Sequence, residues 1–116
     1  MNTPAPATPP VPTLDREALR AKLARGDDFK LVMASKDWAF DAKHIAGSIH
    51  FHNPAEMLAA LKKDDEIVVY CSNVDCRASG ATIKLLREHG YTRLAHYPGG
   101  LIDWENGGLP LVGDWA

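Results

Sequence analysis

The residues best suited to covalent chemistry lie in one short stretch, from Cys71 to Arg77. This stretch holds both cysteines of the chain, Cys71 and Cys76, and ends on a fixed positive charge. A cysteine reacts as its thiolate, which a nearby arginine and the N-terminus of a helix both favour. The segment therefore predicts a sulfur nucleophile, Cys71, beside a binding place for an anion.

The flanking elements would place Cys71 where a strand ends and a helix begins. Residues 66–70 contain an uninterrupted β-branched and aromatic run, which is typical of a strand buried on both faces of a parallel sheet. Apolar residues at helical spacing predict a helix over residues 77–89, with Gly90 as its left-handed stop. Ligands gather at such junctions, because helix N-termini present unpaired N–H groups there. We therefore expect the Cys71 sulfur to be exposed and surrounded by main-chain donors.

The remaining elements are predicted from shorter patterns. They are a helix with Thr13 as N-cap and Gly26 as stop, a strand over 29–34, an extended segment over 48–51, a helix from its cap Asn53 through Leu61, a strand over 93–97 and a short helix over 101–105. Because strands alternate with helices, we expect a three-layer α/β fold with a mainly parallel sheet flanked by helices. Residues 1–12 hold five of the eight prolines and predict a flexible tail, which leaves residues 13–116 as the domain.

Composition limits the possible partners and compartments. The chain has 116 residues, of which 46% are hydrophobic and 24% charged, and this is ordinary for one globular domain. Its formal charge is −2 and it has no basic block, which argues against binding to nucleic acid or to a membrane surface. The N-terminus does not read as a secretory signal, so we expect a cytoplasmic location in which the thiols stay reduced.

Three motifs in order give the chain a family resemblance between about Thr13 and Val112. The segment 44–49 reads HIAGSI, a strand then ends in Cys71, and the segments 97–104 (YPGGLIDW) and 108–110 (GLP) close the pattern. Together they resemble the single-domain rhodanese-like proteins, whose corresponding segments are His-Ile-Pro-Gly-Ala, Glu-Gly-Gly-x-x-x-Trp and Gly-Leu-Pro. Each motif alone would be weak, whereas the ordered set is specific.

The resemblance implies sulfurtransferase chemistry without a cofactor. Cys71 would take a sulfane sulfur from a small anionic donor such as thiosulfate, become a persulfide, and pass the sulfur to a thiol, a cyanide-like nucleophile or an acceptor protein. A persulfide carries negative charge, which the N–H groups of the following loop would stabilise. The residues expected to bind the anion are Ser72, Asn73, Val74, Asp75, Cys76, Arg77 and Ser79.

The sequence also departs from the family, and these departures leave two alternatives open. Residues 31–35 lack the Asp-x-Arg pair of many relatives, Ala78 stands where the usual arginine would align, and the loop after Cys71 is about two residues longer than the common one. The spacing from Cys71 to Arg77 fits the longer loops of rhodanese-like phosphatases and arsenate reductases, although Asp75 disfavours a multiply charged phosphate. The other alternative is a catalytically silent binding module with the same fold.

Structural interpretations stand beside the functional ones. Cys71 could be a buried core thiol, Cys76 either a resolving thiol or a packing residue, and Arg77 a solvated charge. Ser72 and Ser79 fit either anion binding or ordinary loop and cap positions. His44, His50 and His52 invite a zinc hypothesis together with the cysteines, but the spacing of the thiols matches no common zinc motif, so the sequence predicts no metal. Trp38, Trp104 and Trp115 are expected to pack.

Overall fold

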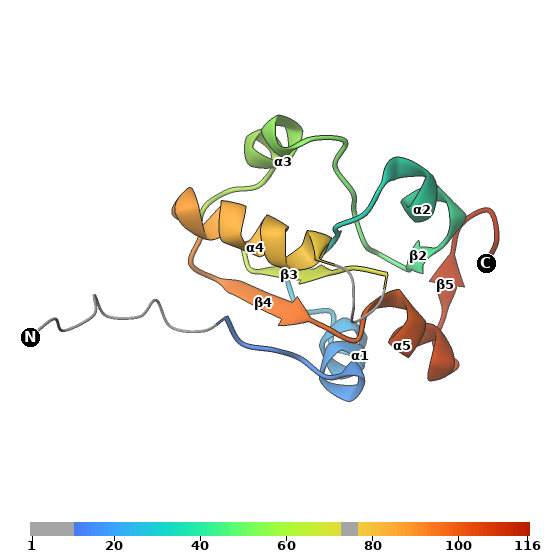
Figure 1. Cartoon of the computed structure of the whole chain (residues 1–116). Coiled ribbons are helices and arrows are strands. Elements are labelled where there is room, and N and C mark those ends of the chain that lie inside the picture. Colours follow the sequence, from blue (N-terminus) through green and yellow to red (C-terminus); the bar gives the residue numbers. More distant parts are fainter. Residues whose placement is uncertain (1–10, 73–76) are drawn as a thin grey trace, which may run out of the picture.

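The computed structural model describes residues 11–72 and 77–116. Within them the chain alternates between short helices and short strands (Figure 1). The order is α1 (Arg16–Ala24), β1 (Lys30–Met33), α2 (Asp37–Ala42), β2 (His44–Ile45), α3 (Pro54–Ala60), β3 (Ile67–Tyr70), α4 (Ala78–Glu88), β4 (Leu94–Tyr97), α5 (Gly100–Asn106) and β5 (Leu111–Val112).

A parallel sheet forms the centre of the molecule, as predicted. Its strand order is β1-β3-β4, with β3 in the middle and parallel to both neighbours. Parallel bridges extend the two edges, where Ile49 pairs with Val32 and Thr13 pairs with His96. Because all three strands run in the same direction, their carboxyl ends lie at the same end of the sheet. Cys71 follows the central strand at this end.

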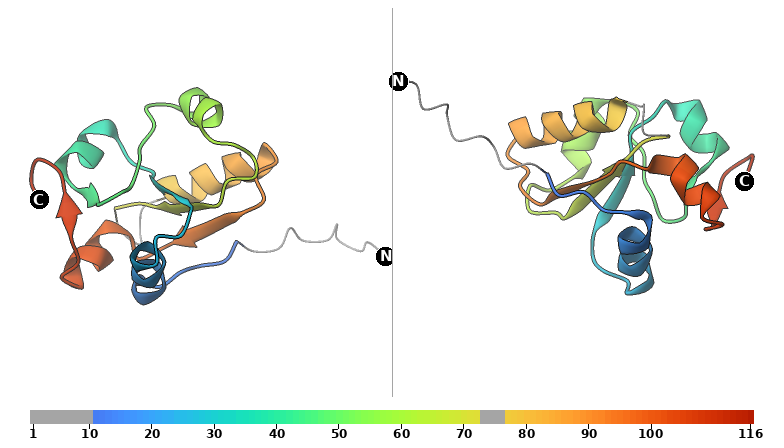
Figure 2. Two further views of the ribbon diagram at one scale, coloured as in Figure 1. Left: turned by 180° about the vertical axis from the view of Figure 1, so that it is seen from behind. Right: turned by 60° about the horizontal axis from the view of Figure 1, so that its bottom comes forward.

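Helices cover both faces of the sheet and confirm the three-layer α/β fold (Figures 1 and 2). Side chains alternate along β3: Ile67 and Val69 pack in one cluster, and Val68 and Tyr70 in the other. The first cluster is completed by residues of α3 and α4, including Met57, Ile83 and Leu86. The second is completed by Leu19 of α1 and by Leu101 and Trp104 of α5. All four residues of β3 are buried, as the unbroken apolar run predicted.

Several predicted helix boundaries are confirmed, and one cap is corrected. Gly26 and Gly90 follow α1 and α4 with φ of 70° and 88°, the left-handed conformation that stops a helix. The N-cap of α1 is Asp15 rather than Thr13, because the Asp15 carboxylate accepts a hydrogen bond from the Ala18 N–H at 2.7 Å. Thr13 is instead part of the sheet edge.

The N-terminal segment joins the sheet through the edge strand β4. The His96 N–H donates to the Pro12 carbonyl at 2.9 Å, and the Leu14 N–H donates to the His96 carbonyl at 2.8 Å. Val11 packs against the core cluster formed with α3 and α4. The first ten residues of the predicted tail lie outside the described part of the chain.

Only one of the three tryptophans is a packing residue. Trp104 is 2% exposed, and its indole N–H donates to the Pro110 carbonyl at 3.1 Å. Trp38 and Trp115 are 65% and 72% exposed, so the expectation that they pack is wrong. No helix among the described residues is long and apolar enough to cross a membrane.

The start of α3 offers a test of the local sequence signals. Asn53 is the N-cap and its side chain accepts from the Glu56 N–H at 2.8 Å, while Pro54 occupies the first turn. Replacing Asn53 by Ala should lower the free energy of unfolding by about 1 kcal/mol, because the Glu56 N–H loses its partner. Urea denaturation measures this loss, and Asn53→Ser, which keeps an acceptor, should recover most of it. Equal stability of the Ala and Ser variants would contradict the capping role.

Candidate active site

Cys71 lies directly after the central strand and is held there by the main chain. Its carbonyl accepts a hydrogen bond from the Leu101 N–H at 2.9 Å, and the carbonyl of Ser72 accepts from the Ile102 N–H at 3.0 Å. Both donors belong to the first turn of α5, where N–H groups have no partner within the helix. The Tyr97-Pro98-Gly99-Gly100 turn, which leads into α5, therefore places donors that fix the backbone at Cys71, and this gives the sequence motif a physical role.

The state of the Cys71 sulfur differs from the expectation. The residue is 2% exposed, whereas the sequence predicted an exposed sulfur, and it is disulfide-bonded, whereas the sequence predicted a reduced thiol. Cys76, the other cysteine of the chain, lies outside the described residues, as do Asn73, Val74 and Asp75. A disulfide-bonded cysteine is not a nucleophile, so nucleophilic chemistry at Cys71 would require reduction first.

Two of the predicted anion-binding residues, Arg77 and Ser79, lie at the start of α4 in different environments. Arg77 is exposed and stands at the N-cap position of α4, where its side chain makes no capping hydrogen bond. Ser79 is 2% exposed, and its hydroxyl oxygen lies 2.9 Å from Nε2 of His96 on β4. The Ser79 hydroxyl is thus engaged with the sheet. This contact places His96, for which no sequence motif indicated a functional role, close to the candidate site.

A buried tyrosine connects the HIAGSI segment to the strand that carries the cysteine. The hydroxyl of Tyr70 accepts from the Ile45 N–H at 3.0 Å and lies 2.8 Å from the Ser48 hydroxyl, which itself donates to the Ile45 carbonyl at 2.7 Å. Burial raises the pKa of Tyr70 to about 12, so the phenol stays protonated near neutral pH. The network anchors residues 44–49 beside the last residue of β3.

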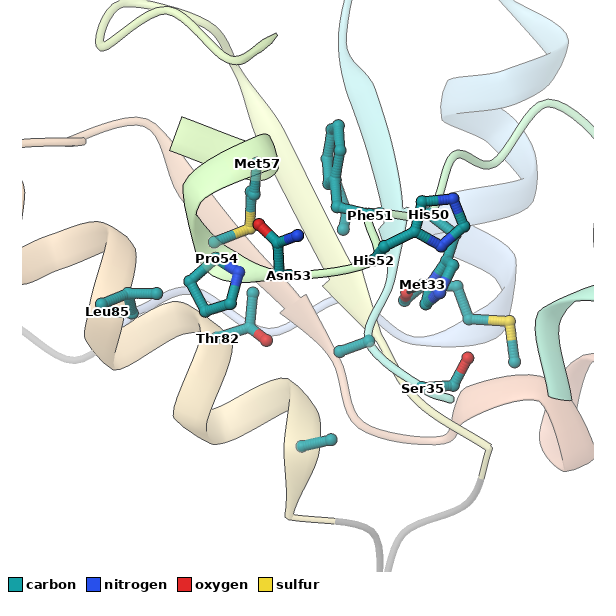
Figure 3. Close-up of a pocket in the computed structure, with 13 residues that line it drawn as sticks. Met33, Ser35, His50, Phe51, His52, Asn53, Pro54, Met57, Thr82 and Leu85 are labelled. Carbon is teal, nitrogen blue, oxygen red and sulfur yellow. Dashed lines mark hydrogen bonds between the residues drawn. The ribbon is translucent and has the colours of Figure 1, made fainter. Parts of the chain in front are cut away.

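A pocket of about 200 Å³ opens between α3, α4 and the end of β1 (Figure 3). Its apolar wall includes Val32, Phe51 and Met57, and His50 and His52 contribute polar edges. Ala78 and Thr82 line it from α4, so the pocket adjoins the start of that helix. The described residues that the sequence predicted for the site do not line this pocket; they are the predicted nucleophile Cys71 and the predicted anion-binding residues Ser72, Arg77 and Ser79.

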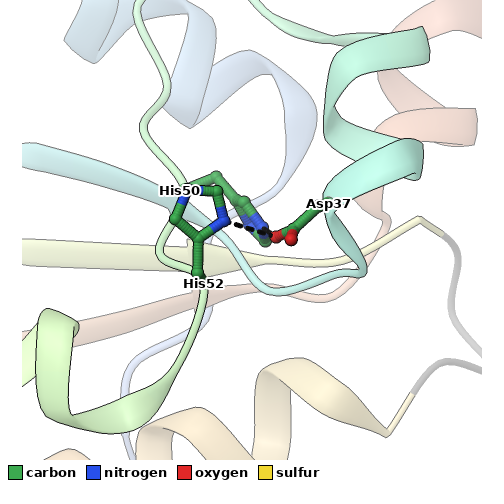
Figure 4. Close-up of side chains that lie close together, drawn as sticks. All are labelled: Asp37, His50 and His52. Atoms are coloured by element: carbon green, nitrogen blue, oxygen red, sulfur yellow. Dashed lines mark hydrogen bonds and ion pairs between the residues drawn. The ribbon is translucent and has the colours of Figure 1, made fainter.

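His50 and His52, which line this pocket, form a cluster of ionisable side chains with Asp37 (Figure 4). Oδ1 of Asp37 lies 2.6 Å from Nε2 of His50 and 2.9 Å from Nδ1 of His52. Hydrogen bonds from these imidazoles, that of His50 foremost, hold the pKa of Asp37 below its ordinary value, and the bond to Asp37 raises the pKa of His52. The zinc hypothesis from the sequence included both histidines but not Asp37.

Comparisons with known proteins define the class of this chain. A model of the rhodanese-like domain matches residues 15–107, so the chain belongs to the rhodanese-like domain family. A sulfurtransferase from Allochromatium vinosum is 29% identical over 101 residues, which cover 85% of this chain and 92% of that protein.

Solved structures agree on the fold. A rhodanese-like domain from an Anabaena protein has a TM-score of 0.80 at 23% identity and covers 90% of this chain and 80% of its own. A Bacillus halodurans protein has a TM-score of 0.82 at 18% identity, covering 90% and 78%. The thiosulfate sulfurtransferase from Pseudomonas aeruginosa has a TM-score of 0.72 at 22% identity, and the match covers 89% of this chain but 20% of that protein.

The partly buried His96 predicts how the stability of the protein depends on pH. Burial lowers the pKa of His96 below its ordinary value of 6.5, so the folded protein disfavours the charged ring. The unfolded chain then binds more protons, and the contribution of His96 to stability is complete above pH 6.5 and is lost as the pH falls below it. Urea unfolding from pH 8 to 5 should show the wild type losing more stability than His96→Gln, which carries no titrating group. Parallel pH curves for the two proteins would contradict this account.

Proposed function

We propose that the protein is a sulfurtransferase that carries a sulfane sulfur on Cys71, from a small anionic donor such as thiosulfate to a nucleophilic acceptor. The observation that carries this proposal is the position of Cys71. It follows the central strand of a parallel sheet, and α4 is the next described helix along the chain, in a protein of the rhodanese-like family. The sulfurtransferase from Allochromatium vinosum supports the same general activity.

The proposed reaction has two displacement steps and needs no external oxidant. The Cys71 thiolate attacks the outer sulfur of thiosulfate, the S–S bond of the donor breaks, and sulfite leaves with the electron pair. The acceptor, a thiol, a cyanide-like nucleophile or an acceptor protein, then attacks the outer sulfur of the persulfide. The S–S bond of the persulfide breaks and the Cys71 thiolate is released.

Two described residues are proposed to bind the donor. Arg77 is exposed at the start of α4 and provides a fixed positive charge for the sulfonate oxygens. Ser72 is half-buried, and its hydroxyl is proposed to bind the anion or the persulfide, since its carbonyl is already engaged by the Ile102 N–H.

The disulfide at Cys71 sets a condition on the activity. A thiolate is needed for the first step, so the protein with an oxidised Cys71 should be inactive until a dithiol reduces it. This condition suits a reducing compartment such as the cytoplasm, which we propose as its location.

Intact-protein mass spectrometry tests the proposal. After reduction and removal of the reductant, thiosulfate should add one sulfur, about 32 mass units, because one persulfide forms per active thiolate. Cyanide should then remove this mass and yield thiocyanate. The unreduced protein serves as the control and should gain nothing. No mass gain in the reduced protein would contradict the proposal.

Reduction of an oxyanion such as arsenate is a second candidate, favoured by the disulfide bond of Cys71 and the spacing to Arg77. The Cys71 thiolate would displace an oxygen of arsenate as water. A second thiol would then attack the Cys71 sulfur, forming a disulfide while the electron pair passes to arsenic and gives arsenite. Two thiols are oxidised for each arsenite formed. Thiol titration of the reduced protein after arsenate treatment, compared with Cys76→Ser, identifies this reaction. If the reduced protein reacts with neither thiosulfate nor arsenate, a catalytically silent binding module is favoured.

A further inference from the structure

The Asp37, His50 and His52 cluster lies outside the proposed sulfur chemistry and has the composition of a metal site. The three side chains offer one carboxylate oxygen and two imidazole nitrogens, and these atoms all lie within 4.8 Å of one another. They come from α2 and from the segment after β2, which the fold brings together at the end of β1 (Figure 4). Two imidazoles and a carboxylate are a ligand set of zinc and of other divalent transition metals.

The hydrogen bonds of His50 identify which of its nitrogens is available as a ligand. Nδ1 of His50 lies 3.1 Å from the Met33 carbonyl oxygen, which can only accept, so Nδ1 carries the hydrogen. In the neutral ring Nε2 is then an acceptor, yet it lies 2.6 Å from Oδ1 of Asp37, which is also an acceptor. Two acceptors at this distance require a cation, either a second proton on the ring or a metal ion that both bind. A histidine that donates its other N–H to a backbone carbonyl is typical of metal ligands.

The surroundings hold one ligand rigidly and leave the other two adjustable. The His50 side chain is 7% exposed, and its ring stacks on Phe40 with centroids 5.2 Å apart. The side chains of Asp37 and His52 are 55% and 65% exposed. Ligand atoms around a tetrahedral zinc are separated by roughly 3.3–3.5 Å, as its bond lengths require. Oδ1 of Asp37 now lies 2.6 Å from Nε2 of His50 and 2.9 Å from Nδ1 of His52. Both distances reach the zinc range when the exposed side chains of Asp37 and His52 shift by less than about 1 Å.

We propose that Asp37, His50 and His52 bind one divalent ion of the zinc class, with an open coordination position toward the pocket between α3 and α4. His50 and His52 both line this pocket, so an ion held by them would face its interior. Nitrogen ligands disfavour calcium and magnesium, which prefer oxygen. The proposal uses neither cysteine and does not depend on sulfur transfer.

Metal titrations of the untagged 116-residue chain test the site in the Cys71→Ser/Cys76→Ser background, where no thiolate can bind the ion. Isothermal titration calorimetry with Zn²⁺ should give one equivalent, and Co²⁺ should give d–d absorption without sulfur charge-transfer bands. His52→Ala should weaken Zn²⁺ binding by at least about tenfold, since loss of a direct ligand costs no less than loss of an outer-shell partner. Asp37→Asn should also weaken it. His89→Ala removes an exposed histidine at the end of α4 and should bind as the background does.

Nuclear magnetic resonance of the histidine nitrogens tests the ligand atoms directly, without a substitution that could lower stability. Zn²⁺ should shift the ¹⁵N resonances of His50 Nε2 and His52 Nδ1, while the Nδ1–H of His50 stays bonded to Met33. The proposal is overturned if His52→Ala and Asp37→Asn bind Zn²⁺ as tightly as His89→Ala. It is equally overturned if the thiol-free protein binds no Zn²⁺, or if the ion shifts only other histidines. None of these three results would affect the sulfurtransferase proposal.

Discussion

Replacing Cys71 by Ser should reduce thiosulfate:cyanide sulfur transfer by at least about 10⁴-fold, to the rate of the buffer background, because the reaction loses the atom that carries the sulfur. A serine hydroxyl is not ionised near neutral pH and cannot form a persulfide. The measurement is sulfite release from thiosulfate by pre-reduced protein, followed with and without cyanide. Both steps should fail, since the second consumes the product of the first.

The variant needs a control for folding, because Cys71 is buried at the end of the central strand. The reduced wild type and Cys71→Ser should give the same far-ultraviolet circular dichroism and similar urea midpoints. A reduced wild type is the right reference, since the variant cannot form the disulfide. If a folded Cys71→Ser protein kept a substantial fraction of the wild-type rate, Cys71 would not be the nucleophile.

Replacing Trp104 by Ala should lower the free energy of unfolding by about 3–5 kcal/mol, the usual loss for a large buried aromatic. Trp104 is 2% exposed, meets the ring of Tyr97 edge-on at a centroid distance of 6.2 Å, and donates to the Pro110 carbonyl. It anchors α5, whose first turn holds the carbonyls of Cys71 and Ser72. Urea denaturation measures the effect, and sulfur transfer should decline in the fraction that remains folded.

The two exposed tryptophans provide matched controls for this variant. Trp38→Ala and Trp115→Ala remove the same side chain from solvent-facing positions, so each should change stability by no more than about 0.5 kcal/mol. If all three substitutions lowered the free energy of unfolding by the same amount, the packing of Trp104 in the core cluster beside β3 would not be the cause of its effect. A loss below about 1 kcal/mol for Trp104→Ala would also contradict the account.

The sequence predicted the central elements well because their signals are local and strong. The buried run of β3, the capped start of α3 and the glycine stop after α4 all lie where the residues indicated. The helix α2 was not predicted, and its cap residue Lys36 makes no capping hydrogen bond. The two-residue pair β2 and β5 was also missed, because it joins segments far apart in the chain that carry no strand pattern of their own.

The candidate site was predictable only where its residues are contiguous. The position of Cys71 after a buried strand followed from the run of residues before it. The bond between Ser79 and His96 joins a helix to a strand, and Asp37 reaches His50 and His52 only because α2 begins at the end of β1. The prediction of no metal rested on the spacing of the histidines and cysteines. It did not include a carboxylate from another element, such as Asp37. No spacing rule identifies such a ligand in a single sequence.

The most direct test of sulfur transfer through Cys71 follows a labelled atom. Reduced protein is treated with thiosulfate that carries a heavy isotope at its outer sulfur, alkylated, digested and examined by mass spectrometry. The account predicts the label on the peptide that contains Cys71, unlabelled sulfite in solution, and labelled thiocyanate when cyanide is added to the loaded protein. Label on a peptide without Cys71, or labelled thiocyanate formed with no labelled protein before it, would contradict a persulfide at this cysteine.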